Sequence, residues 1–422
     1  MSENSFSFRS GSGSEPQIGP AGIGFRRDQS LVTSAAAIDT KCCVPPARDK
    51  LLFTPGPLTT SSAVKEAMLR DAGSWHYEFN ALVASVREEL LRLAGLTRES
   101  GWEAILMQGS GTFGVEAVFQ TCVPPSGKVA VLANGAYGER MAQMLGHARI
   151  EHTVLREEET RAVEPGRLEA LLELDRAVTH VALVHCETTT GILNPIAEVG
   201  RVARAHKKTF VVDAMSSFGG MPFDFEECHV DFLISSPNKC IESVPGFSFI
   251  LCRRSVLLEC EGWARSLSLD LLAQLKAFEA NGQFRYTPPT HSLLAFRRAL
   301  EELLVEGGIA VRNERYRANH RTLLAGMSRL GFETLLAPEV QSPFITAFLY
   351  PNNGWFDFNL FYRVLSDRGF IIYPGKLTRA DTFRIGTIGR IFPADIESLL
   401  YAIELSVREL RRQKRWLPVT EK

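Results

Sequence analysis

The sequence lacks several patterns that would assign it to a class at once. No apolar run reaches the ~18 residues that a membrane-spanning helix requires, and the N-terminus has no continuous apolar segment of the secretory type. The 47 basic and 48 acidic residues leave a formal net charge of −1. We therefore expect no membrane partner, and so balanced a charge gives no whole-chain attraction to nucleic acid.

Patterns for metal binding and disulfides are also missing. The eight cysteines include no CxxC pair and no zinc-finger spacing, and most of them lie in apolar or strand-like segments. Such cysteines are expected to be reduced, buried thiols in a reducing compartment. We therefore predict no metal site and a cytoplasmic location.

Length and composition suggest three parts. Residues 1–47 are rich in Ser, Gly and Pro and are expected to form a disordered leader, although their Arg and Ser content also allows an organellar presequence. The remaining chain is too long for one ordinary domain. We expect a large domain at 48–300 and a smaller C-terminal α+β domain at 301–422.

Short apolar runs separated by helix-like segments indicate the fold class. Continuous apolar strands that alternate with helices are typical of an α/β domain with a mainly parallel sheet between layers of helices. Ligands of such sheets bind at the carboxyl ends of the strands. The runs are AILMQ at 104–108, VAVLAN at 129–134, VALVHCE at 181–187, FVVDA at 210–214, FLIS at 232–235 and FSFILC at 247–252.

A glycine-rich segment follows the first of these strands. Gly109, Gly111 and Gly114 match the pattern G-x-G-x-x-G of dinucleotide-binding folds, so an NAD-dependent oxidoreductase is one alternative. The next strand, however, closes in Asn134 instead of the acidic residue that would bind a ribose. Ser110, Gly111 and Thr112 still stand at a predicted helix N-terminus, which suits a single phosphate, or they simply cap and pack the helix.

Two charged residues follow apolar strands further along the chain. Asp213 ends the strand FVVDA, where a carboxylate is costly unless it caps a turn or meets a ligand. Lys239 stands just after the strand FLIS. A phosphate site, an acid and a lysine at one sheet edge are the set that pyridoxal phosphate requires: the lysine forms the Schiff base, the acid keeps the pyridine nitrogen protonated, and the helix end binds the phosphate.

Two more residues fit this interpretation. Tyr137 follows a strand end and is placed to stack on a pyridine ring, although a half-buried packing tyrosine is the ordinary alternative. Arg384 lies in an apolar C-terminal strand, where it serves either a structural ion pair or the acid group of a substrate. Lys376 is a further candidate cation.

Taken together, these segments resemble the class V, fold-type I pyridoxal phosphate aminotransferases. The resemblance extends from about residue 51 to 410, which leaves out only the leader and the last residues. The motifs that carry it include TPGPLTTSSAVKEAML, GSGTFGVEAV, NGAYGER, HCETTTGILNPI, VVDAMSSFGG, LISSPNKCIESVPGFSF, YTPPTHSLLAF and YPGKLTRADTFRIGTIG.

The resemblance implies roles for individual residues. Lys239 would be the Schiff-base lysine and Asp213 the partner of the pyridine nitrogen. Tyr137 would stack on the ring and Thr188 would hydrogen-bond near its phenolic oxygen. The remaining predicted residues would bind the cofactor phosphate (Ser110, Gly111, Thr112, Ser236, Asn238 and, from the neighbouring subunit, Thr287) or the substrate (Arg384 and Gly56).

Among class V members, the motifs are most similar to those of enzymes that use 2-aminoethylphosphonate as amino donor and pyruvate as acceptor. This similarity implies a two-stage, ping-pong reaction that yields phosphonoacetaldehyde and L-alanine, and a homodimer with shared sites. The segment WHYEFN at 75–80 differs from the acidic run expected of those enzymes. An alanine– or serine–glyoxylate transaminase is therefore the main alternative, whereas a cysteine desulfurase is disfavoured because Asn238, not His, precedes the lysine.

Overall fold

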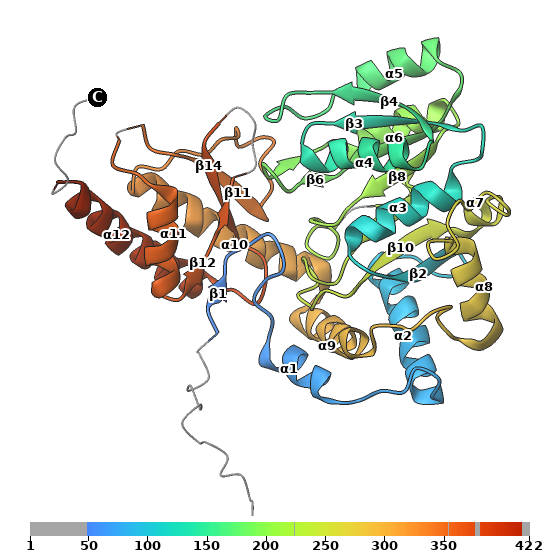
Figure 1. The fold of residues 1–422 in the computed structure, drawn as a ribbon, viewed down its shortest axis with the longest axis horizontal. Coiled ribbons are helices and arrows are strands. Elements are labelled where there is room, and N and C mark those ends of the chain that lie inside the picture. The colour runs from blue at the N-terminus through green and yellow to red at the C-terminus, as the bar shows by residue number, and fades with distance from the viewer. Residues whose placement is uncertain (1–48, 223, 353, 376–379, 416–422) are drawn as a thin grey trace, which may run out of the picture. The chain divides into compact units, whose positions relative to one another are not determined.

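The computed structural model describes residues 49–415 except 223, 353 and 376–379 (Figure 1). The predicted leader and Lys376 therefore lie outside the described residues. Within the described part, no helix has both the length and the apolar character needed to cross a bilayer.

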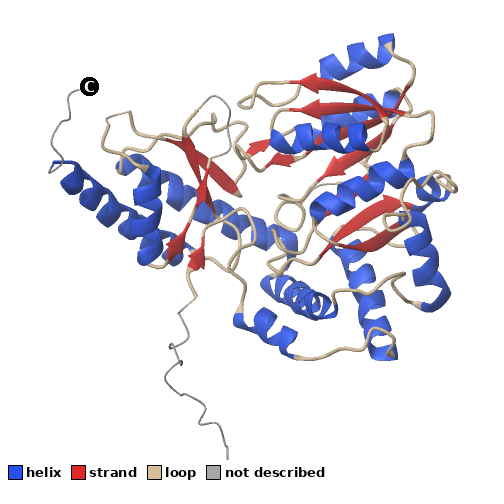
Figure 2. Ribbon diagram, in the orientation of Figure 1, coloured by secondary structure: helices blue, strands red, loops and turns tan. Residues whose placement is uncertain are grey.

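The centre of the larger part is a seven-stranded sheet. Only β10 runs antiparallel to its neighbours, and the other strand pairs are parallel, which confirms the predicted mainly parallel α/β fold. Figure 2 shows the strands surrounded by helices. The strands lie in the order β2 (Trp102–Gln108), β10 (Phe247–Arg253), β9 (Phe232–Ser235), β8 (Thr209–Asp213), β5 (Val178–Val184), β3 (Lys128–Ala133) and β4 (Glu151–Arg156).

Burial explains which strands the sequence reveals. The six predicted runs form strands whose residues are almost all buried, as their apolar character requires. The seventh strand, β4, is not predicted, because its sequence EHTVLR is polar and its residues are half-buried or exposed. It lies at the edge of the sheet and pairs with β3.

Helices connect and cover the strands. Helices α3 (Gly111–Cys122) and α4 (Ala136–His147) pack against each other, with α3 over β9 and β10 and α4 over β3 and β4. The remaining helices of this part are α1 (Ser62–Glu66), the 3₁₀ turn η2 (Ala67–Leu69), α2 (Tyr77–Leu93), α5 (Pro165–Leu174), α6 (Ile196–Ala205), α7 (Arg254–Leu258), α8 (Leu271–Asn281) and α9 (Thr290–Glu306). A short hairpin, β6 (Cys186–Glu187) and β7 (Ile192–Leu193), follows β5.

The smaller C-terminal part has its own sheet and its own hydrophobic core. Strands β11 (Ile345–Leu349), β14 (Thr382–Gly386) and β13 (Tyr373–Pro374) form the sheet, and the helices are α10 (Gly308–Arg329), α11 (Phe358–Asp367) and α12 (Pro393–Arg415). The N-terminal strand β1 (Leu51–Leu52) pairs in parallel with β12 (Phe370–Ile371), and Phe53 belongs to this second core. The domain boundary near residue 300 stays a prediction.

Candidate active site

One cavity of about 310 Å³ brings most of the predicted site residues together at the carboxyl edge of the sheet. It opens where β2, β8 and β9 end and where the N-terminal segment after β1 passes close by. Among the predicted residues that the structure describes, all except Thr287 and Arg384 line it: Gly56, Ser110, Gly111, Thr112, Tyr137, Thr188, Asp213, Ser236, Asn238 and Lys239.

Lys239 and Asp213 lie at the same edge because β8 and β9 are parallel neighbours, with Asp213 paired with Ile234. Asp213 is the last residue of β8, is only 6% exposed, and accepts a hydrogen bond from Met215 N at 2.9 Å. Burial raises the pKa of this carboxyl to about 6. Lys239 is half-buried, and burial lowers the pKa of its amine to about 8, although the Asp213 charge opposes the shift.

Gly56 forms the wall behind the lysine. A Cβ at this position would lie 2.6 Å from the carbonyl oxygen of Asn238 and 2.8 Å from Cδ of Lys239. The backbone also has φ +112°, which side-chain-bearing residues rarely adopt. Any other residue here would push the lysine out of its present position.

The N-terminus of α3 has the features of an anion site. Ser110 is the N-cap residue, and its side chain makes no capping hydrogen bond. The N–H groups of Gly111 and Thr112 have no acceptor within the helix, since the first turn of any helix leaves them free. Ser110, Gly111 and Thr112 all line the cavity, so a phosphate bound there would meet the helix N-terminus.

The glycine pattern itself is explained by close packing. A Cβ on Gly111 would collide with the side chain of Met215, and one on Gly114 would lie 2.6 Å from Oγ of Ser248 in β10. The small residues thus allow α3 to lie tightly on the sheet. No nucleotide-specific role is needed to account for them.

Tyr137 stands in the first turn of α4 and faces the cavity. Its amide donates to Oε2 of Glu187 at 3.1 Å, and Glu187 is fully buried. The carboxylate also accepts from the hydroxyl of Thr189 at 2.8 Å. Glu187 therefore caps α4 from a neighbouring hairpin and fixes the start of the helix that carries Tyr137.

Sequence reasoning missed Glu187 and also Arg140. Arg140 lines the cavity, donates from Nη1 to Oγ1 of Thr112 at 3.2 Å, and places its guanidinium 4.7 Å from the centre of the Tyr137 ring. Arg140 could have been found from its spacing, because it follows Tyr137 by three residues and so lies on the same helix face. Glu187 could have been found as the acid in HCETTTG, which follows an apolar strand.

Arg384 lies beside the cavity without lining it. It is 2% exposed and donates from Nη1 to the carbonyl of Thr188 at 2.9 Å and from Nε to the carbonyl of Pro374 at 3.0 Å. Burial lowers the pKa of its guanidinium. Because Thr188 lines the cavity, Arg384 is separated from the cavity by this single residue in space.

Thr287 is not brought to the cavity of its own chain. It is exposed, and its carbonyl accepts from Nε2 of Gln108, at the end of β2, at 3.3 Å. Its predicted role is at the phosphate site of a neighbouring subunit.

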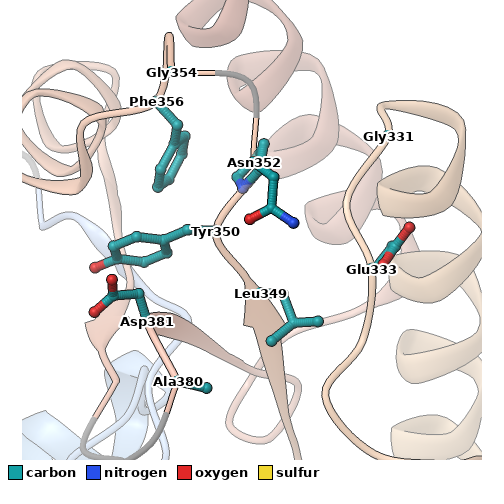
Figure 3. Close-up of a pocket in the computed structure, with 10 residues that line it drawn as sticks. Gly331, Glu333, Leu349, Tyr350, Asn352, Gly354, Phe356, Ala380 and Asp381 are labelled. Carbon is teal, nitrogen blue, oxygen red and sulfur yellow. The ribbon is translucent and has the colours of Figure 1, made fainter.

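A second pocket, of about 640 Å³, lies in the C-terminal part, where Figure 3 shows Tyr350 pointing its hydroxyl toward Asp381. Several of its lining residues, including Glu333, Asn352 and Asp381, are exposed, and it contains no predicted site residue. We assign the chemistry to the smaller cavity, because that cavity holds Lys239 and the buried Asp213.

Comparison with known proteins identifies the family. The family model described as aminotransferase class-V matches residues 60–376. A relative from Syntrophobacter fumaroxidans named 2-aminoethylphosphonate--pyruvate transaminase is 52% identical over 358 residues, which cover 85% of this chain and 96% of the relative. One of the same name from Salmonella paratyphi C is 50% identical over 362 residues, covering 85% and 98%.

Solved structures with lower sequence identity share the fold. An alanine--glyoxylate aminotransferase from Nostoc sp. superposes with a TM-score of 0.79 at 24% identity and covers 86% of this chain and 96% of its own. A ureidoglycine-glyoxylate aminotransferase from Bacillus subtilis gives 0.78 at 22% identity, with 86% and 94% covered. On the family match and the close relatives, the chain belongs to the class V aminotransferases.

Proposed function

We propose that this aminotransferase moves the amino group of 2-aminoethylphosphonate to pyruvate and yields phosphonoacetaldehyde and L-alanine. The class V family supplies the reaction type and its cofactor, pyridoxal phosphate. The names of relatives at least 50% identical over 85% of the chain support this choice of substrates. The observation that carries the catalytic part is the placement of Lys239 and Asp213 in one cavity beside the N-terminus of α3.

The residues present fit the cofactor. Asp213 would face the pyridine nitrogen, Tyr137 would stack on the ring, and Ser110, Gly111 and Thr112 would bind the phosphate, with Ser236 and Asn238 nearby in the segment just before Lys239. When bound, pyridoxal phosphate supplies an electron sink next to the carbon that bears the amino group. Gly56 and Lys239 both line this cavity.

Lys239 is proposed to carry the proton in both halves of the reaction. An amine with a pKa of about 8 is partly neutral near pH 7. Its Nζ atom can therefore accept a proton from the carbon next to the donor nitrogen and then donate that proton to a different atom. A lysine at its ordinary pKa would be almost fully protonated under the same conditions. Burial therefore prepares this side chain as a base.

Arg384 is proposed to bind the acid group of each substrate in turn. A guanidinium has five N–H donors, of which the carbonyls of Thr188 and Pro374 take two. Its planar fork can bind either a phosphonate or a carboxylate. These two carbonyl contacts would fix the orientation of the fork before substrate arrives.

A panel of amino donors tests the substrate assignment. With pyruvate as acceptor, 2-aminoethylphosphonate is expected to exceed propylamine, which lacks the acid group, by at least about 100-fold in kcat/KM, because propylamine would leave the proposed Arg384 site unpaired. Formation of L-alanine is the measurement with pyruvate, and formation of glycine is the measurement with glyoxylate. Equal or better rates with L-serine or L-alanine and glyoxylate would favour the alternative, a glyoxylate-type class V transaminase.

Arg140 is proposed to bind the cofactor phosphate, since it already contacts Thr112. We expect Arg140→Met to weaken binding of pyridoxal phosphate to cofactor-free protein by about 10- to 100-fold, the usual value of a charge-assisted hydrogen bond. Binding of pyridoxal, which lacks the phosphate, should change little. The matched control is Arg156→Met, which removes a surface ion pair with Glu139; equal losses for both ligands would contradict the role.

A homodimer with active sites at the subunit interface is also proposed, with Thr287 reaching the phosphate site of the partner. The exposed position of Thr287 is compatible with this arrangement. We expect sedimentation equilibrium to give twice the mass of one chain, and a monomer that is fully active would contradict the proposal. The cytoplasmic location expected from the sequence stays a prediction that cell fractionation would test.

A further inference from the structure

The turn that follows Lys239 contains a buried acid in an unfavourable backbone conformation. Glu242 is 2% exposed and has φ +64°, in the left-handed region that a glutamate seldom occupies. Its N–H donates to the carbonyl of Lys239 at 2.8 Å, so the conformation closes a tight turn directly behind the lysine. Strain of this kind persists only where the surroundings hold the residue in place.

Two residues of α10 donate hydrogen bonds to the carboxylate of Glu242 in this turn. The Glu242 Oε1 atom accepts from Nη2 of Arg315 at 2.7 Å and from the hydroxyl of Tyr316 at 2.6 Å. A third α10 residue, Arg312, donates from Nη1 to the carbonyl of Cys240 at 3.1 Å. The turn is therefore held both by its side chain and by its backbone.

The charges of this cluster balance. Glu306, the last residue of α9, accepts from Nε and Nη2 of Arg312 at 3.0 and 2.7 Å and from Nε of Arg315 at 2.7 Å. Two acids thus face two arginines in a buried setting, where an unpaired charge would be costly. Removing one member would loosen the others as well.

Arg315 also reaches the segment that follows the strand of Arg384. Its Nη1 atom donates to the carbonyls of Gly389 at 2.7 Å and Ile391 at 2.9 Å, shortly after β14. One guanidinium therefore touches both the lysine turn and the chain that leads away from Arg384.

We infer that the cluster of Glu242, Glu306, Arg312, Arg315 and Tyr316 is a positioning device for Lys239, which holds the lysine turn at a fixed place relative to the Arg384 segment. The inference rests on the proposed role of Lys239. These residues are positioning residues, since none of them lines the cavity. Proton transfer depends steeply on the placement of the base, and a displacement of 1 Å can cost about 100-fold in rate.

A matched pair of variants separates positioning from plain stability. Glu242→Gln removes the charge at the turn. Glu103→Gln removes an equally buried acid of β2, 3% exposed, that pairs with Arg87 of α2 at 2.9 Å and with Arg254 of α7 at 2.7 Å. Tyr316→Phe deletes only one hydroxyl and keeps every charge. If Glu242→Gln does not fold, Tyr316→Phe provides the test of positioning. Thermal unfolding of the cofactor-free proteins gives the loss of stability for each variant.

Two readouts follow the lysine itself. Amide hydrogen exchange of the peptide 237–243 in cofactor-free protein reports the turn, and borohydride trapping with mass spectrometry reports the rate at which pyridoxal phosphate becomes attached to Lys239. In Glu242→Gln and Tyr316→Phe we expect faster exchange and attachment slowed by about 10- to 100-fold. In Glu103→Gln we expect a lower melting temperature with both readouts unchanged.

An attachment rate in Glu242→Gln and Tyr316→Phe that equals the wild-type or Glu103→Gln rate would overturn the inference, whatever the exchange data show. Failure of the proposed function gives a different result, in which the wild-type protein itself attaches no pyridoxal phosphate at Lys239.

Discussion

Replacing Lys239 by alanine is expected to lower kcat for amino transfer by about 10⁴-fold, the upper range for loss of a positioned proton carrier. The variant also loses the amine to which the cofactor attaches, so borohydride treatment should trap no cofactor on the protein. Both losses follow from the position of Lys239 as the lysine that lines the cavity. Rates of L-alanine formation and mass spectrometry of the treated protein are the measurements.

Lys276→Ala is the control for this variant, because Lys276 is an exposed lysine that pairs with Glu261 at 2.5 Å. It should keep wild-type activity. A small primary amine added to Lys239→Ala should restore part of the rate if the missing function is that of a base. Substantial activity of Lys239→Ala without any added amine would contradict the assignment of Lys239 as the base.

The second large effect is expected at Asp213. Asp213→Asn keeps the shape of the side chain and removes its charge, and kcat should fall by about 10³-fold, as it does when a site loses one preorganised electrostatic partner. In cofactor-free protein the variant should also lower the pKa of Lys239 below 8, because among the neighbouring charges the Asp213 carboxylate raises this pKa most. The rate of reductive methylation of Lys239 against pH measures that shift.

The Asp213→Asn substitution should lower activity but raise the stability of the cofactor-free protein at neutral pH. The pKa of Asp213 is raised from 3.8 to about 6 in the fold, so ionisation opposes folding. This cost is absent below pH 3.8, develops as the pH rises to about 6, and is complete above it, where it amounts to about 3 kcal/mol. Cofactor-free Asp213→Asn should therefore match the wild type in denaturant melts near pH 3.5 and exceed it at pH 7. A variant less stable at pH 7 would contradict the assigned burial cost.

The sequence predicted those parts of the fold in which local pattern and tertiary environment agree. The strand ending at Asp213 and the strand before Lys239 are continuous apolar runs, and both are buried central strands. Strand β4 was missed because an edge strand need not be apolar. The pairing of β1 with β12 joins distant segments of two residues each, and no local pattern could reveal it.

The same distinction applies to the site. Asp213 and Lys239 were predictable because a charge at the end of an apolar strand demands a partner. Glu242 and Arg315 were not, since their partnership depends on how α10 lies against the lysine turn, and each residue alone looks like an ordinary charge in a helix or loop. Arg140 falls between these cases, because its spacing from Tyr137 was visible but its contact with Thr112 was not.

The wall that Gly56 forms behind Lys239 has a consequence for synthesis of the chain. Gly56 follows β1 and Phe53, which are held by β12 and by a core built from residues of the C-terminal part. A ribosome translates the N-terminal segment first, yet β1 and Phe53 cannot reach their final positions until residues near 371 have emerged. The central sheet can form earlier, but the lysine pocket should be completed only near the end of translation.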